Sequence, residues 1–533
     1  MSASAYAGAD RGRLFGDWQP WLWEVNDELI ADGDALAARA WDLFRNDTYS
    51  RAMVMTLVGH IVGPMGLPWR STYQSDDSED TSESELLDRR SLENYVRRAT
   101  KGIRFDAGGM MSWRQMTAAM LICRIVAGDA FAVRCFKPGR PDAYRGTCWR
   151  LIDPARVCNP NDGIDTERLV RGIELDFDGV PIAIHVRSSH PAIRRASAAA
   201  TWQRIPFYSA TNRRNVIHFA RRDRPDQIRG VSEFASNIRH LKYLADVTWY
   251  WVVAKKLQAS NCIIVECAAP AAAAAKDRNG ALLNGTHGIK PGMKYYVETG
   301  TKVHLVNANF QGADYKDFRN ANFESACAPW GLPYELVLHS LTGANLSAAR
   351  AAIEQFHLTT DRWRADLSEC VLQPWVESII LDGLEMGDIS PQNPDPERVS
   401  EGRFVPPPKI SPDRLKDANA AKAWVELGRS FASVYGEAGY AFEPEIAQRR
   451  LDERLMESQG IAIYDPSAPQ APPPPFDDPN ADPNADPTTD DEPADPTDNM
   501  PTDDTTTAPA ADLSRHPVNS TGQAIDTTNS PIR

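Results

Sequence analysis

The spacing of apolar residues predicts a long helix near the middle of the chain, from Ser232 to about Gln258. Six residues recur there at steps of three and four positions, which places them on one helical face: Phe234, Ile238, Leu241, Ala245, Thr248 and Val252. The helix is roughly 40 Å long at about 1.5 Å per residue. Its segment VTWYWVV (247–253) is apolar all the way round, so we expect that end to be buried on several sides.

A second long helix is predicted to begin at Ser347, because serine caps helix starts well. Six residues then follow a spacing of alternately three and four positions: Ile353, Phe356, Thr360, Trp363, Leu367 and Cys370. We expect Pro374 to bend or restart this helix, because proline has no backbone N–H to donate.

Between these helices the chain carries β-rich runs and a turn-rich loop. Residues 261–309 hold two β-rich runs, Cys262–Glu266 and Met293–Val297, and Tyr315–Ala326 reads as a short helix. The next segment, WGLPYELVLHSLTGANLS (330–347), has glycine, proline and asparagine around an apolar centre.

The apolar tip of that loop, formed by Val337, Leu338 and Leu341, has two interpretations. One is an interior connection between helices, which the spacing alone favours. The other is a loop that projects from the body to touch something else.

The first half of the chain reads as helices followed by short strands. Helices are predicted over Asp34–Val62 and Ser91–Ile125, with an exposed acidic loop, Ser71–Glu85, between them. From Ala130 to Ile217 short β-like runs alternate with turn signals, and the clearest pair of strands joins at Asp178-Gly179. The fold class is therefore α+β.

After the second long helix the chain becomes rich in proline. Asp388–Pro408 reads as a Pro-rich linker, and Ser411–Ser458 reads as helical. From Tyr464 onward, PPPP, DPNADPNADP and TTT runs predict a disordered tail. The Asp repeat looks like a calcium loop, but Pro483 stands where that loop needs glycine and no glutamate closes it, so we exclude calcium.

The net charge of −14 is unevenly distributed along the 533 residues. Residues 464–533 hold fourteen acidic residues against two arginines, a net charge of −12, which leaves about −2 for residues 1–463. The body is nearly neutral, so the overall charge says nothing about its partners.

Ten arginines between Arg187 and Arg229 form the strongest basic run. Guanidinium groups bind phosphate bidentately, so a nucleic-acid patch is one interpretation. The other is that these arginines pair with acidic residues across subunit joints or stay solvated. We favour the second, because no aromatic residues are interleaved to stack on bases.

The residue types that carry catalysis or bind metals lack the spacing that either role requires. The phosphate-loop, dinucleotide-binding, zinc-protease and serine-hydrolase patterns are all missing. The ten histidines form no metal-ligand pair at helical spacing, and the eight cysteines form no CxxC pair, so we expect free thiols. We predict no catalytic residue, no metal and no cofactor.

Membrane insertion and secretion are also not expected. Arg239, Lys242, Asp246 and Lys255 interrupt the run of about 20 apolar residues that a membrane span needs. The first residues lack the basic-then-apolar pattern of a signal peptide.

Seven sequence blocks, in order over about 400 residues, resemble the lambda-like portal protein family of tailed bacteriophages. They are ARAWDLFRNDTYSRAMVMTLVGHIVGPMG (38–66), LICRIVAGDAFAVR (121–134), LIDPARVCNP (151–160), GIELDFDGVPIAIHVRSSHP (172–191), NVIHFARRDRPDQIRGVSEF (215–234), WGLPYELVLHSLTGANLSAARAAIEQF (330–356) and VPPPKISPDRLKDANAAKAWVELG (405–428). Each block alone is weakly specific, and their order carries the signal. Trp41, Phe44 and Met65 depart from the family pattern, and residues 464–533 have no counterpart.

The resemblance implies a portal fold with a wing, a helical stem, a β-containing clip and a helical crown. The implied divisions are the N-terminal arm and wing (1–230), stem helices (231–260 and 311–330), clip (261–310), tunnel loop (331–346), long wing helix and linker (347–408), crown (409–463) and acidic tail (464–533).

By the same resemblance, copies of the chain, twelve in number, would form a ring at a capsid vertex, and double-stranded DNA would pass through it. The tunnel loop would face that DNA with Leu336, Val337, Leu338, His339, Ser340, Leu341 and Thr342. Candidate basic contacts in the channel or clip are Lys255, Lys256, Lys276, Arg278 and Lys290.

The implied partners are the terminase large subunit, head-completion or connector proteins, and the major capsid and scaffold proteins. The implied location is the virion, after assembly in the host cytoplasm. Without a phosphate loop the chain would be a passive ring rather than the packaging motor. Two other functions stay open, namely a head-tail adaptor ring that never touches DNA and a nucleic-acid-processing enzyme with an unfamiliar site.

Overall fold

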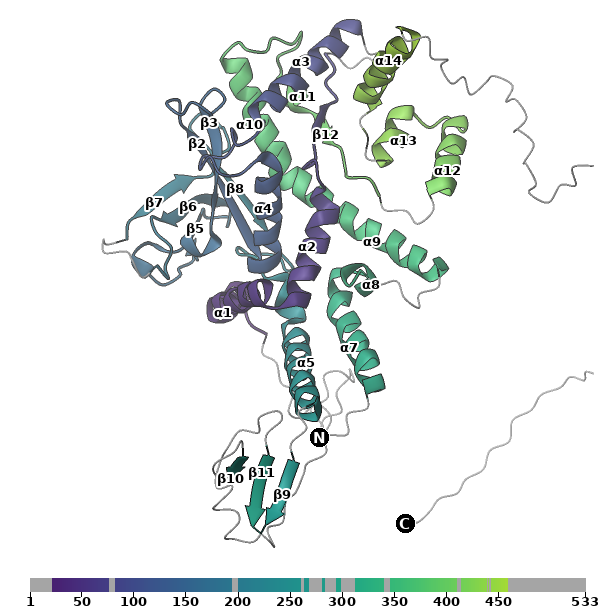
Figure 1. The fold of residues 1–533 in the computed structure, drawn as a ribbon. Helices are drawn as coiled ribbons and strands as arrows, with labels where there is room; N and C mark the ends of the chain where they lie inside the picture. Colours follow the sequence, from purple (N-terminus) through teal and green to yellow (C-terminus); the bar gives the residue numbers. More distant parts are fainter. Residues whose placement is uncertain are drawn as a thin grey trace, which may run out of the picture. The chain divides into compact units, whose positions relative to one another are not determined.

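The computed structural model describes residues 22–75, 82–193, 200–259, 263–267, 280–282, 294–298, 312–339, 346–409, 414–438, 440 and 442–458. All of them belong to the first of two units of the chain, Met1–Ile461, and the second unit is Ala462–Arg533. The tail predicted to be disordered therefore lies outside the described residues. Helices and strands are mixed, as the α+β class requires (Figure 1).

The helix predicted over Asp34–Val62 is in fact two helices, α1 (Val25–Asn46) and α2 (Thr48–Val62). Asp47 separates them, because its extended backbone ends α1 while its carboxylate accepts the N–H of Ser50 and caps α2. α2 buries residues on several sides and belongs to the larger of two hydrophobic cores.

Helices α3 (Glu83–Ala99) and α4 (Trp113–Ala127) each begin with a capping box, Ser82 with Glu85 and Ser112 with Gln115.

The prediction of an exposed loop over Ser71–Glu85 is wrong at both ends of that range. Ser71 ends strand β1 (Trp69–Ser71), and buried Glu85 also accepts the N–H and hydroxyl of Ser75. The bonds from Ser75 and Ser82 lower the pKa of Glu85 to about 2.

Two antiparallel sheets follow, and they face each other across the second hydrophobic core (Figure 1). The first has the order β3-β2-β8, with β2 (Asp129–Phe136), β3 (Thr147–Ile152) and β8 (Val216–Ala220). The second has the order β4-β5-β6-β7, with β4 (Leu169–Val170), β5 (Ile173–Leu175), β6 (Pro181–Arg187) and β7 (Trp202–Pro206).

The predicted hairpin at Asp178-Gly179 is confirmed. β5 and β6 pair antiparallel on either side of it, and Gly179 has the positive φ of 80° that its turn requires. Two short 3-10 turns, Pro154–Arg156 and Pro160–Asp162, connect the sheets.

The central helix is α5 (Ile238–Ala259), which follows a 3-10 turn, Glu233–Ser236, capped by the Ser232 hydroxyl. A parallel sheet of order β10-β11-β9 comes next, with β9 (Ile263–Cys267), β10 (Gly280–Leu282) and β11 (Lys294–Glu298). The two β-rich runs predicted between the long helices are therefore strands, and they pair directly. The chain returns through α7 (Gly312–Cys327), a 3-10 turn (Ala328–Trp330) and α8 (Tyr334–Val337).

The second long helix is α9 (Leu346–Leu367), which continues through a π-helical turn, Ser368–Leu372, into α10 (Gln373–Glu385). Pro374 stands in the first turn of α10, so it restarts the helix as predicted. Cys370 is exposed, whereas Ile353 to Leu367 of the same spacing are buried. The wider π-turn rotates the following residues, so Val371 and Leu372 face the core instead.

The expected Pro-rich linker, Asp388–Pro408, is wrong in its middle. It contains α11 (Pro396–Ser400) and β12 (Gly402–Phe404), which pairs antiparallel with β1 more than 300 residues away. A side chain at Gly402 would collide with the Trp69 ring, so glycine is required there.

Three helices close the described chain: α12 (Arg414–Glu426), α13 (Phe431–Glu437) and α14 (Phe442–Ser458). They confirm the helical prediction over Ser411–Ser458. Across the described residues, no helix is both long and apolar enough to cross a bilayer.

Candidate functional site

The candidate site begins with α5 and α7, which lie side by side and antiparallel (Figure 1). At one end the rings of Trp251 and Tyr315 stack, with centroids 4.5 Å apart, and the Tyr315 hydroxyl bonds Thr248 Oγ1 at 2.9 Å. At the other end Asn237 Nδ2 donates to the carbonyl of Ala326 at 2.9 Å. The two helices that flank the β9–β11 segment are thus joined near both ends.

The face of α5 that α7 and the core leave uncovered carries aromatic rings. Leu241 and Leu244 are buried, whereas Tyr243, Trp249 and Tyr250 are 65%, 61% and 69% exposed. The expected burial of VTWYWVV on several sides is therefore wrong for a single chain, because one neighbouring helix can cover only one side.

A buried cluster of charged side chains connects the 3-10 turn before α5 to three other elements. The Arg124 guanidinium lies 4.1 Å from the Trp363 ring centroid and 5.0 Å from that of Phe219, and it pairs with Glu233 at 3.1 Å. Arg221 pairs with the second oxygen of Glu233 at 2.9 Å. Burial raises the pKa of Glu233, and the two arginines offset that effect only in part. The 3-10 turn before α5 is thus connected through one arginine to α4, β8 and α9.

The structure places the predicted tunnel loop partly inside the molecule. Val337 is only 2% exposed because α8 packs against α2, and Leu336 and Leu338 lie half-buried against the main core. The prediction that Val337 faces DNA is therefore wrong in this chain. His339 is exposed, with φ of 50°, at the point where the chain leaves the core. Ser340, Leu341 and Thr342 lie outside the described residues.

Three histidines that are far apart in the sequence lie close together near the base of this loop: His60, His339 and His357. His60 on α2 lies edge-on to Phe356, and Arg364 donates to its carbonyl oxygen at 2.7 Å. Burial lowers the pKa of His60, and positive charge on His357, Arg364 and His339 lowers it further. Sequence spacing could not reveal this cluster, because it joins α2, α9 and the end of α8.

The cluster is not a metal site, since no group of three His, Cys, Asp or Glu residues within the described ranges could hold an ion. Six thiols are free, as expected: Cys123, Cys135, Cys148, Cys158, Cys327 and Cys370.

Two of the five candidate basic contacts are described, Lys255 and Lys256 near the end of α5. Their ammonium groups lie over the rings of Trp251 and Trp249, at 5.7 and 6.0 Å from the centroids. Lys276, Arg278 and Lys290 lie outside the described residues.

The arginine-rich segment 187–229 largely forms ion pairs within its own chain. Clear examples are Arg204 with Glu174, Arg224 with Glu28 and Arg229 with Asp129. These three arginines therefore have carboxylate partners, so they are not free to bind phosphate. The pairs join parts of one subunit, whereas pairs across subunit joints were expected.

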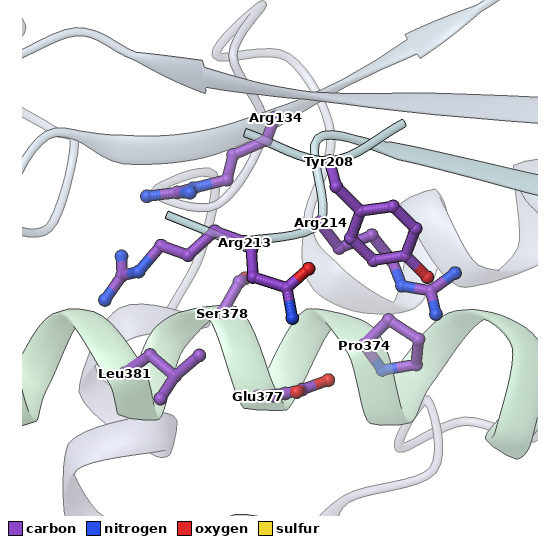
Figure 2. Close-up of a pocket in the computed structure, with 9 residues that line it drawn as sticks. Arg134, Tyr208, Arg213, Arg214, Pro374, Glu377, Ser378 and Leu381 are labelled. Carbon is purple, nitrogen blue, oxygen red and sulfur yellow. The ribbon is translucent and has the colours of Figure 1, made fainter. Parts of the chain in front are cut away.

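A cavity beside this segment has a volume of about 240 Å³ and lies between α10 and the loop before β8 (Figure 2). Arg134 and Arg213 both pair with the buried Asp382 of α10, and Arg214 lies 5.2 Å from the Tyr208 ring centroid. Carboxylates balance the arginines here, so we interpret the cavity as an ion-paired joint between elements.

The most deeply buried charges surround Asp129 at the start of β2. Its carboxylate accepts Arg229 at 2.5 Å, the N–H of Gly230 at 2.7 Å and His218 Nε2 at 2.8 Å. Burial raises the pKa of Asp129, but Arg229 and His218 lower it by more, so it lies well below its usual range. Burial lowers the pKa of His218, whose ring stacks on Phe131 at 4.3 Å. This cluster joins β2, β8 and the loop that leads to α5.

One protein family matches this chain over most of its length, and individual relatives match less than half of it. The family "Phage portal protein, lambda family" matches residues 11–364. The portal protein of Escherichia phage N15 is 27% identical over 246 residues, and portal protein B of Escherichia phage lambda is 25% identical over 248 residues. Each match covers 44% of this chain and 44% of the relative, so the chain spans less than half the length of these relatives.

Solved structures of gene transfer agent particles are more distant. A chain of the native virion has a TM-score of 0.40 at 12% identity, with 79% of this chain and 95% of that chain covered. A chain of the empty particle's neck, computed with C6 symmetry, has a TM-score of 0.41 at 13% identity, with 77% and 93% covered. TM-scores of 0.40 and 0.41 are too low to support an inference about this chain.

The resemblance inferred from the seven sequence blocks is thus confirmed independently. Because the family match spans residues 11–364, more than half of its length, this chain belongs to the lambda family of phage portal proteins, a structural rather than an enzymatic family of the virion.

Proposed function

We propose that copies of this chain close into a ring at one capsid vertex and that double-stranded DNA is packaged and ejected through its centre. Family membership carries this proposal. By the same resemblance the ring has twelve copies and docks the terminase large subunit during packaging. Head-completion or connector proteins bind it afterwards, and the major capsid and scaffold proteins surround it. Assembly takes place in the host cytoplasm.

The α5–α7 pair supports the assignment of the stem. It is a two-helix hairpin that leads out to the β9–β11 strands, as a stem that carries a clip would be. Residues 231–260 and 311–330 are then the stem, 261–310 the clip, 1–230 and 347–408 the wing, and 409–463 the crown.

The exposed rings of α5 support ring closure by a second copy. Several large aromatic side chains that are exposed on one helix often mark an interface. Head-to-tail contacts between identical copies close into a ring when the rotation permits. We therefore assign Tyr243, Trp249 and Tyr250 to the contact between neighbouring stems.

The tunnel loop is proposed in a modified form. Leu336, Val337 and Leu338 anchor its base in the core, and the DNA-facing part begins at His339 and continues through Ser340, Leu341 and Thr342. Apolar groups at this tip would press on a duplex without giving it fixed hydrogen bonds. The anchor at α8 would transmit that pressure to α2 and α9.

Electron microscopy of the purified protein tests the proposal. Class-averaged top views should show a ring whose central opening admits a duplex. A monomer, or a ring closed at its centre, would contradict a portal function. A ring that opens at its centre but fails to support DNA packaging in vitro would favour the adaptor function.

A matched pair of variants tests the stem contact. Trp249→Glu with Tyr250→Glu should block ring formation, because charges would be buried between neighbours. Phe177→Glu, at an 86% exposed aromatic on the β5–β6 turn, should leave rings intact. Normal rings from the double variant would remove this face from the contact. Metal-dependent nuclease and ATPase assays test the enzymatic alternative, and we expect neither activity.

A further inference from the structure

An exposed strip of positive charge runs along α3, outside the helices assigned to the stem. Arg90 and Arg97 are spaced by seven positions, so they follow one face of the helix, Arg98 lies beside them, and Lys101 follows just beyond the helix end. All four side chains are exposed. The strip, defined as Arg90, Arg97, Arg98 and Lys101, extends over roughly 16 Å at about 1.5 Å per residue.

Three of the four acidic residues of α3 are bound by other parts of the molecule, and the fourth, Glu83, is exposed at the first position of the helix. Glu93 pairs with Arg70 at 2.6 Å and accepts the N–H of Ser71. Asp88 accepts the N–H of Gln392 at 3.0 Å, and Glu85 is bound by serines. Three of the four carboxylates are thus directed to the body of the protein.

The cations of the strip have no such partners. Arg97 donates to the neutral side chain of Asn94 at 2.7 Å. For Arg90, Arg98 and Lys101, the described part of the chain offers no carboxylate within ion-pairing distance. Among the described residues, the charge of the strip is therefore exposed and unpaired.

Further cations strengthen the field at the C-terminal end of α3. Arg104 donates to the carbonyl of Arg98 at 3.1 Å, and Arg140 donates to the carbonyls of Ile103 and Asp106. Neutral carbonyl groups bind these guanidinium groups, so their positive charge is not cancelled.

Helix capping explains only part of this pattern. Cations in the last turn stabilise a helix through its dipole, which accounts for Arg97 and Arg98. It does not account for Arg90, two turns earlier, or for Lys101, which lies beyond the helix end.

The residue types of the strip indicate which anionic partner it binds: single-stranded nucleic acid, an acidic protein or the phosphates of a duplex. It contains no aromatic residue, and proteins that bind single strands stack bases on aromatic rings. The exposed apolar residues beside it on α3 are Leu86 and Leu87, and leucine is under-represented among the residues that dominate protein–protein contacts. A line of guanidinium and ammonium groups suits regularly spaced phosphates read without sequence preference.

We propose that the α3 basic strip binds the phosphate backbone of double-stranded DNA, as a contact separate from the stem and tunnel loop. The choice of DNA as partner rests on the proposed function, but the contact itself does not depend on a channel.

Fluorescence anisotropy of a labelled blunt duplex of mixed sequence, titrated with the full chain over a series of salt concentrations, tests the strip. The variant Arg90→Glu, Arg97→Glu, Lys101→Glu removes three phosphate contacts. The slope of log K against log salt should then become shallower by roughly 2.7, at about 0.9 per contact, and affinity at about 0.1 M salt should fall roughly 100-fold or more.

The matched control is Arg449→Glu, Arg450→Glu, Arg454→Glu on α14, which changes the net charge equally. Acidic residues are interspersed among these arginines, and Arg449 already pairs with Glu453. The control should bind DNA as the unmodified chain does. Equal losses in both variants, or no loss in the strip variant, would overturn the proposal.

A second measurement needs no variant. Duplex DNA should protect Arg90 and Arg97 of the unmodified protein from phenylglyoxal, and an acidic peptide should not. Protection by the peptide alone would assign the strip to a protein partner and refute the DNA contact. If open rings form while the strip fails both tests, only this inference falls and the portal function stands.

Discussion

Removing Arg229 should destabilise the β2–β8 region more than almost any other single change. Its guanidinium is buried and bonds the Asp129 carboxylate at 2.5 Å. It also donates to the carbonyls of Pro154, Val157 and Arg171 at 3.2, 3.0 and 2.7 Å. Arg229→Met keeps most of the apolar stem but leaves a buried carboxylate and three carbonyls without this donor.

The expected loss is about 3–5 kcal/mol, the usual cost of removing one partner from a buried ion pair. The carbonyl penalties are included in that range, because residues of one network do not contribute additively. The double variant Asp129→Asn, Arg229→Met removes the stranded charge. It should therefore lose less than the two single variants added together, by about 0.5–3 kcal/mol.

Native-state hydrogen exchange of the β2 and β8 amides is the appropriate assay, because a chain of this size need not unfold in one step. All variants should be compared at one protein concentration, since assembly shifts apparent stability. A loss below about 1 kcal/mol for Arg229→Met, or strict additivity in the double variant, would show that water or relaxation satisfies the site and would refute the reasoning.

Three further predictions concern acid sensitivity, the stem and the clip. Burial places the folded pKa of His218 below its ordinary 6.5, so its stabilising effect is complete above pH 6.5 and is lost as pH falls toward the folded value. His218→Gln should remove that part of the pH dependence, up to about 1.4 kcal/mol per pH unit, in hydrogen exchange of β8, and an unchanged profile would contradict it. Trp251→Ala removes the stack on Tyr315, worth about 0.5–1.5 kcal/mol beyond lost burial, so α7 amides should exchange faster while those of α3 do not change. Lys276→Glu with Arg278→Glu should reduce DNA packaging while rings form normally, and normal packaging would remove both residues from the candidate contacts.

Local patterns in the sequence predicted which segments are helices and strands. The 3.6-residue period identified α5 and α9, proline marked the start of α10, and Asp178-Gly179 marked the β5–β6 hairpin. These features depend on neighbouring residues along the chain, which is why they could be predicted.

The sequence did not predict which segments that are far apart along the chain pack against each other. The β1–β12 pair joins residues more than 300 positions apart inside an expected linker. The histidine cluster of His60, His339 and His357 joins three elements that no spacing relates. The basic strip of α3 was also missed, because its significance depends on where Asp88 and Glu93 find their partners.

The sequence by itself determined the element types, the family and the lack of catalytic patterns. Only the tertiary structure decided which faces are covered. It buries Val337 against α2, although the family resemblance placed that residue against DNA, and it leaves Trp249 and Tyr250 exposed, although their apolar run suggested burial. The physical reason is that spacing orients a side chain on its own helix, whereas burial depends on which other element packs against that side.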